Sequence, residues 1–94
     1  MIETRLSLHA ERQAQRRGVA RRTLDLILAH ADRSHKLPGR ARALWVSPKA
    51  RNRLVFSGFS PDEVDRTRGV RIVVAIDEDI VTTVEHMLAR RAWA

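Results

Sequence analysis

An apolar segment in the last third of the sequence gives its clearest structural signal. Residues Val70 to Ile76 are almost continuously apolar, and a second apolar run, Ile80 to Val84, follows after the acidic tripeptide at 77–79. A short, β-branched run of this kind is typical of a strand buried on both faces. We therefore expect a hairpin in which the first strand is central in a sheet and the acidic tripeptide is a solvated loop.

The N-terminal third has the spacing of helices instead. A helix is expected over Leu8 to Arg17, because the Ser7 hydroxyl can accept hydrogen bonds from the first turn and Gly18 suits the left-handed position that ends a helix. A second helix is expected over Arg21 to Ala31, where leucine, isoleucine and alanine recur at helical spacing. Joined by three residues, the two predict a tight helical hairpin.

The remaining segments alternate between the two kinds of structure. Pro38 and Gly39 predict a turn between two extended runs, the second over Ala43 to Val46. Ser47 followed by proline predicts a third helix over Lys49 to Ser57, the same signal recurs at residues 60–63, and the tail at 87–94 has helical propensity. We expect an α+β fold, in which the N-terminal helical hairpin packs on a small antiparallel sheet.

Length and composition restrict the classes of protein that fit. A chain of 94 residues predicts one domain, 1–94. The absence of cysteine excludes disulfides, thiol catalysis and thiolate zinc sites, and no segment has the length and apolarity of a membrane span. We expect a cytoplasmic protein that does not bind a membrane and needs no metal or other cofactor.

The charge of the chain favours an anionic partner. The formal net charge is +7, and residues 1–53 hold 13 Lys and Arg against 4 Asp and Glu, whereas residues 54–94 hold 5 against 7. Such an imbalance attracts polyanions, among which nucleic acid comes first. It is equally typical of an arginine-rich composition without any such function, so the charge alone identifies no activity.

Two histidines and four arginines form the candidate site. On the first helix His9, Arg12 and Arg16 share one stripe, and His86 lies just past the last strand. If that helix packs across the sheet, His9 and His86 supply an acid and a base for RNA cleavage. The arginines would then hold the phosphate: Arg12, Arg16, Arg90 and Arg91. The alternative is that these side chains are merely solvated.

Three segments resemble a known group of small bacterial proteins. They are "HAERQAQRRGV", "LDLILAHADRSHKLPGRARALWVSPKARNRL" and "IVTTVEHMLARR". Together they are similar to a family of small bacterial domains of unknown function, itself similar to BrnT and RelE-type toxins. The resemblance implies helices on an antiparallel sheet and an RNA-cleaving role. It matches the family's histidine-alanine pair to His9 and Ala10, and its final threonine-valine-x-histidine to residues 83–86.

The sequence also departs from that family. Arginine is frequent in the family at the positions of Gln13 and Met87, and RelE-type enzymes commonly use a tyrosine near the end, whereas this chain contains none. Arg17 and Gly18 match the family, but we interpret both as structural. Arg17 lies on the alanine side of its helix, where a carboxylate such as Asp25 can bind it, and Gly18 ends the helix.

Two functional hypotheses follow. The first is a toxin-like, metal-independent ribonuclease that uses His9 and His86. The second is a non-catalytic module that binds nucleic acid, or an antitoxin-type protein partner, with the same basic face. Loss of RNA cleavage in a variant without His9 would favour the first, whereas affinity that falls steeply with salt and follows the number of arginines would favour the second.

Overall fold

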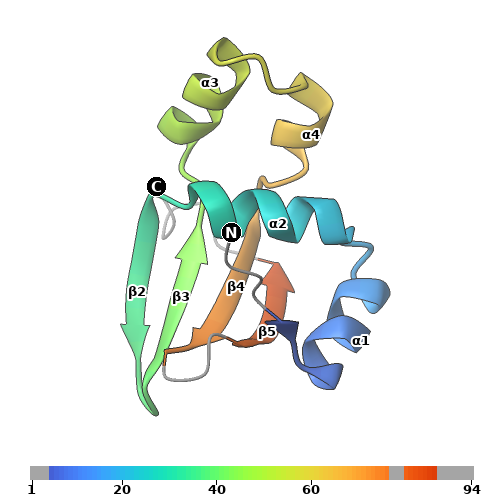
Figure 1. Cartoon of the computed structure of the whole chain (residues 1–94), viewed down its shortest axis with the longest axis vertical. Coiled ribbons are helices and arrows are strands. Elements are labelled where there is room, and N and C mark those ends of the chain that lie inside the picture. Colours follow the sequence, from blue (N-terminus) through green and yellow to red (C-terminus); the bar gives the residue numbers. More distant parts are fainter. Residues whose placement is uncertain (1–4, 77–79, 87–94) are drawn as a thin grey trace.

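The computed structural model describes residues 5–76 and 80–86, and these residues form an α+β fold (Figure 1). They contain four helices and one five-stranded sheet. The strands are β1 (Arg5–Leu6), β2 (Arg33–Leu37), β3 (Ala41–Trp45), β4 (Val70–Ala75) and β5 (Ile80–His86). The helices are α1 (Leu8–Arg16), α2 (Arg21–His30), α3 (Pro48–Phe56) and α4 (Pro61–Asp65). The expected fold class is confirmed, while the loop at 77–79 and the tail at 87–94 lie outside the described residues.

The sheet is mixed rather than antiparallel. Its strand order is β1-β5-β4-β3-β2, and β4 lies in the middle, as its apolar run predicts. Three strand pairs are antiparallel, but β1 is parallel to β5, with Leu6 opposite Val81. The expectation of a purely antiparallel sheet is therefore wrong at this edge. A strand of two residues is too short to show an alternating pattern in the sequence, which is why β1 was not predicted.

The main core lies between α2 and one face of the sheet. α2 crosses this face (Figure 1), and its Leu24 and Ile27 are almost completely buried. They belong to one apolar cluster with Ile72 of β4 and Val84 of β5. Burial of side chains of this size stabilises the fold by about 1.5–3 kcal/mol each. A smaller buried group belongs to the opposite face of the sheet and consists of Ala43, Trp45 and Val73.

The first two helices pack on different parts of the sheet. α1 packs mainly beside β5, whereas α2 packs on β3 and α4. The buried side of α1 consists of Ala10 and Ala14, whose small side chains allow the helix to approach the strand closely. The two helices that were expected to form a hairpin therefore pack mainly on other elements and not on each other.

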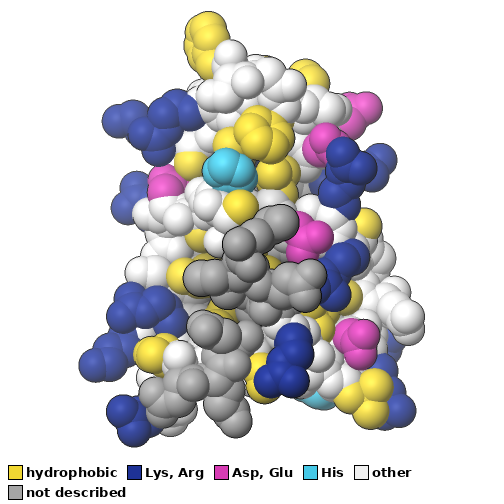
Figure 2. Space-filling view, viewed as in Figure 1, with side chains coloured by type: hydrophobic (Ala, Val, Ile, Leu, Met, Phe, Trp, Pro, Cys, Tyr) yellow, Lys and Arg dark blue, Asp and Glu magenta, His cyan; other side chains and the backbone are white. Residues whose placement is uncertain are grey.

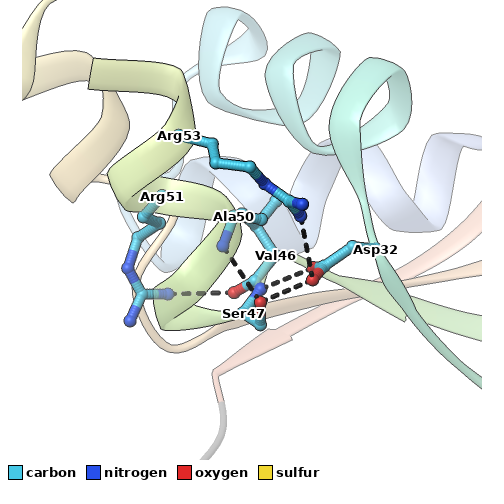
Figure 3. A network of polar contacts seen from close by, with 6 residues as sticks. All are labelled: Asp32, Val46, Ser47, Ala50, Arg51 and Arg53. Carbon is cyan, nitrogen blue, oxygen red and sulfur yellow. Dashed lines mark hydrogen bonds and ion pairs between the residues drawn. The ribbon is translucent and has the colours of Figure 1, made fainter. Parts of the chain in front are cut away.

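α3 and α4 connect β3 to β4 and stand beyond one end of the sheet (Figure 1). The start of α3 is held by Asp32, which lies between α2 and β2 (Figure 3). Asp32 accepts two hydrogen bonds from Ser47, one from the backbone N–H at 2.8 Å and one from the hydroxyl at 2.5 Å. The Ser47 hydroxyl in turn accepts from the N–H of Ala50, so it caps α3 as expected. This network fixes α3 relative to the sheet.

Candidate nucleic-acid interface

The expected stripe on α1 lines a shallow hollow on the surface of this helix. His9, Arg12, Gln15 and Arg16 line it together, and its volume is about 440 Å³. All four side chains are exposed and follow the three- and four-residue spacing of one helix face. The structure therefore brings His9 together with Arg12 and Arg16, as the sequence predicted. These groups supply two phosphate-binding forks and one titratable ring.

Two hydrogen bonds hold α1 against the edge of the sheet. The N–H of Ser7 donates to the carbonyl of Val81 at 2.9 Å, which continues the β1–β5 ladder to the start of the helix. Further along, the side-chain carbonyl of Gln13 accepts from the N–H of Val84 at 2.8 Å. β1 is too short to pair with this part of β5. The Gln13 side chain therefore accepts from a backbone N–H at the sheet edge that would otherwise pair with a neighbouring strand. Sequence analysis treated Gln13 only as a lost phosphate-binding charge and missed this role.

His86 lies at the other end of the contact between α1 and β5. It is the last residue of β5, is exposed, and pairs with Val70 of β4. His9 lies two residues after Ser7, which bonds Val81, and the strand from Val81 to His86 is about 17 Å long. The hollow that His9 lines does not include His86. Their joint action as acid and base stays a prediction.

The other predicted site residues have different outcomes. Arg90 and Arg91 lie outside the described residues. The side chain of Arg17 is exposed, and the Asp25 carboxylate proposed as its partner is bound by Arg21 at 3.2 Å instead. Gly18 has a φ of +67°, which confirms that it ends the first helix in the left-handed conformation.

A second basic surface was not predicted. Residues 33–61 contain seven Lys and Arg and no Asp or Glu, whereas the rest of the chain contains eleven of each. The entire net charge of +7 therefore belongs to the segment that forms β2, β3 and α3. We call this surface the basic edge. Its cationic residues are Arg33, Lys36, Arg40, Arg42, Lys49, Arg51 and Arg53.

The fold concentrates these charges on one side of the molecule. In Figure 2 dark blue side chains follow the left side, where Figure 1 shows β2, β3 and α3, with little magenta among them. On the right side dark blue and magenta lie close together. Ion pairs there join Arg22 to Glu63 and Arg21 to Asp25. One side can thus attract an extended polyanion, whereas the other is largely self-neutralised.

Two cations of the basic edge lie opposite each other on neighbouring strands. Lys36 of β2 is directly opposite Arg42 of β3, and both are exposed. Arg42 donates to the Ser34 hydroxyl at 3.1 Å, which orients its guanidinium along the strand. Like charges in directly opposite positions destabilise a sheet. A bound anion would relieve this repulsion.

Asp32 is an acidic group beside the basic edge, and its bonds are structural. Burial raises the pKa of this carboxyl, but the hydrogen bonds from Ser47 lower it more, so the pKa lies below its ordinary value of 3.8. The nearest guanidinium nitrogen of Arg53 is 4.0 Å away (Figure 3). Asp32 is therefore ionised at neutral pH and is engaged in holding α3.

The described residues offer no arrangement for a metal or a membrane span. Within 5–76 and 80–86, no three His, Asp or Glu side chains are placed to hold a metal ion together. None of the helices in this part of the chain is both long and apolar enough to cross a bilayer. Comparisons of the chain with models of protein families, with curated proteins and with solved structures gave no match.

Proposed function

We propose that this chain is an RNA-binding domain that holds the phosphate backbone on its basic edge. The observation that carries the proposal is the placement of the whole net charge on β2, β3 and α3, which form one side of the molecule. Phosphate contacts of this kind supply most of the affinity of sequence-independent binding. Lys36 and Arg42, which repel each other in the free protein, would both contact phosphate.

The test compares two triple variants with the same net charge. R33Q/K36Q/R42Q removes three cations from the basic edge, whereas R21Q/R22Q/R66Q removes three from the opposite side. We expect the first variant to bind a labelled 20-nucleotide single-stranded RNA at least tenfold more weakly than the second, as measured by fluorescence anisotropy. Equal affinity of the two variants would contradict the proposal, because only total charge would then matter.

The salt dependence of the same measurement tests the kind of contact. Each neutralised phosphate of a single strand contributes roughly −0.7 to the slope of log K against log salt. The slope should therefore be about two units shallower in R33Q/K36Q/R42Q than in the wild type. A slope unchanged by the three substitutions would mean that these residues do not contact phosphate. RNA binding insensitive to salt would exclude phosphate contacts as the source of the affinity.

Ribonuclease activity is the second candidate, because His9 shares one hollow with Arg12 and Arg16. A histidine beside two guanidiniums can move a proton at a phosphodiester whose charge the arginines stabilise. The resemblance to a family of small bacterial domains that is similar to BrnT and RelE-type toxins, with the RNA-cleaving role that it implies, supports this candidate. The order of helices and strands agrees with it only at the level of an α+β fold.

Cleavage is tested on RNA and on DNA of the same sequence, with EDTA present. The expected result is cutting of RNA alone that is lost in His9→Ala and retained in His35→Ala, because His35 is an exposed histidine on β2 that the hollow does not include. Cleavage by His9→Ala at the wild-type rate would exclude His9. A further loss in His86→Ala would support the paired mechanism, and an unchanged rate would exclude His86.

A further inference from the structure

A recess between α3 and α4 gathers polar groups outside the surfaces already described. Its volume is about 160 Å³, which is several times the ~30 Å³ that a water molecule occupies in the liquid. The two helices pack on each other next to it. Its lining consists of Pro48, Arg51, Asn52, Val55, Pro61, Val64, Asp65 and Arg68.

Arg51 is held in place on one side of the recess. Its Nη1 donates to the backbone carbonyl of Val46 at 2.9 Å, and its side chain is partly buried (Figure 3). Burial lowers the pKa of the Arg51 guanidinium, and the positive charge of Arg68 lowers it further. Arginine remains charged despite such effects. Both guanidiniums line the same recess, where their like charges repel each other.

Arg68 lies on the other side and is anchored through one nitrogen. Its Nε donates to the Asp65 carboxylate at 3.1 Å. A guanidinium has five N–H donors, so this bond leaves the terminal nitrogens available for a second acceptor. The recess thus contains two guanidiniums, one side-chain amide and a single carboxylate. Its net charge is positive, and its donors outnumber its acceptors.

The helix that forms one side of the recess, α3, ends in an exposed aromatic residue. Phe56 is 94% exposed, the most exposed large apolar side chain of the described residues. It follows Asn52 by four residues on α3, so the two lie on the same stripe of the helix. An exposed ring beside phosphate-binding groups is typical of proteins that stack the bases of single strands.

We propose that the recess between α3 and α4 binds a phosphate group of an RNA strand, with Arg51, Arg68 and Asn52 as donors and Phe56 as the platform for the adjacent base. An oxyanion there would accept from both guanidiniums and remove their repulsion. The recess continues the basic edge, because Arg51 belongs to both surfaces. The assignment of the phosphate to an RNA strand rests on the proposed RNA-binding function, whereas the proposal of a phosphate site does not depend on that function.

The first experiment uses small ligands, so that its outcome is independent of RNA affinity. Inorganic phosphate and adenosine 5′-monophosphate are titrated into the ¹⁵N-labelled protein at constant ionic strength, with chloride as the control anion. We expect saturable shifts of the amides of α3 and α4 with phosphate and not with chloride. Because one stacked base contributes ~1 kcal/mol or more, adenosine 5′-monophosphate should bind at least about fivefold more tightly.

Three variants assign the contacts, and a fourth serves as the control. Arg68→Gln should abolish the saturable shifts, and Arg66→Gln, which changes an exposed arginine at the end of α4 outside both the recess and the basic edge, should leave them unchanged. Arg51→Lys retains the charge but loses the planar fork, so it should weaken phosphate binding several-fold. Phe56→Ala should leave inorganic phosphate binding intact and remove the advantage of the nucleotide.

The outcomes separate the two proposals. Absence of saturable phosphate binding, or shifts that persist in Arg68→Gln, would overturn the recess as a phosphate site, even if RNA binds to the basic edge. RNA affinity unchanged in Arg68→Gln and Phe56→Ala would overturn its role in holding the strand. Phosphate binding at the recess without any RNA affinity would instead contradict the proposed function, and equal binding of phosphate and nucleotide would exclude the Phe56 platform.

Discussion

At the scale of single residues, Ser47 makes more contacts than the sequence reveals. Its side chain is 2% exposed, and its hydroxyl both accepts from the N–H of Ala50 and donates to Asp32. The cap was predictable, because serine followed by proline is a local signal. The bond to Asp32 was not, because the partner lies 15 residues away and is brought close only when β2 and β3 pair.

Substitution of Ser47 should therefore cost more than loss of an ordinary cap. Ser47→Ala removes the cap of α3 and one bond to the Asp32 carboxylate, for an expected loss of about 2–3 kcal/mol in the free energy of unfolding. Ser60→Ala is the matched control, because Ser60 precedes α4 without a side-chain capping bond. For that control, urea unfolding should show a loss of less than about 0.5 kcal/mol in the free energy of unfolding. Equal effects of the two substitutions would mean that the network contributes nothing beyond helix propensity.

Asp32 makes the stability of the fold depend on pH. Its pKa is lower in the folded protein than in the unfolded chain, so its contribution is fully present above the ordinary carboxyl pKa and is lost as the pH falls through the folded value. We expect the stability difference between the wild type and Asp32→Asn to be largest near pH 6 and to shrink toward pH 3. Urea unfolding across that range measures it. A difference that stays constant would show that the charge of Asp32 is irrelevant.

At the scale of elements, Gln13 connects α1 to β5 where β1 ends. Gln13→Ala would leave the Val84 N–H without its protein acceptor, and a lost hydrogen bond of this kind costs about 1 kcal/mol. Hydrogen exchange should show faster exchange of the Val84 amide, with the amides paired between β3 and β4 unchanged. Gln15→Ala serves as the control, because Gln15 is exposed on the same helix. Unchanged protection of Val84 in Gln13→Ala would show that the edge is held without this bond.

Local signals explain which elements the sequence predicted. Ser7 and Gly18 bound α1, Ser47 and Pro48 start α3, and the apolar run marks β4, each within a few residues of its observed limits. Long-range relations account for the failures. The parallel pairing of β1 depends on where the chain lies after folding, and the bond from Gln13 to Val84 joins residues 71 positions apart.

The candidate site shows the same division. Helical spacing was sufficient to place His9, Arg12 and Arg16 in one hollow. The absence of acidic residues from 33–61 is visible in the sequence, but its meaning is not, because this segment becomes one surface only when β2 pairs with β3 and α3 stands beyond the end of these strands. The recess at Arg51 and Arg68 likewise requires α3 to pack on α4.

At the scale of the whole molecule, the separation of charge predicts that the fold is strained electrostatically at low salt. Repulsion within the basic edge is weakly screened at 0.01 M salt, where the screening length is about 30 Å, and much more strongly at 0.15 M, where it is about 8 Å. The wild type should therefore gain stability as salt rises over this range. R33Q/K36Q/R42Q should gain less, because it removes the cross-strand pair of Lys36 and Arg42.

The two triple variants also separate local repulsion from total charge. At low salt R33Q/K36Q/R42Q should be more stable than the wild type, by an amount on the order of 0.5–1 kcal/mol, since like charges opposite each other in a sheet destabilise it. R21Q/R22Q/R66Q has the same net charge but loses the ion pairs to Asp25 and Glu63, so it should be equally stable or slightly less stable than the wild type. Urea unfolding at both salt concentrations measures these differences. If both variants were stabilised equally, the repulsion would depend on the net charge of the chain alone. The basic edge would then not be a surface where local repulsion favours binding of an anion.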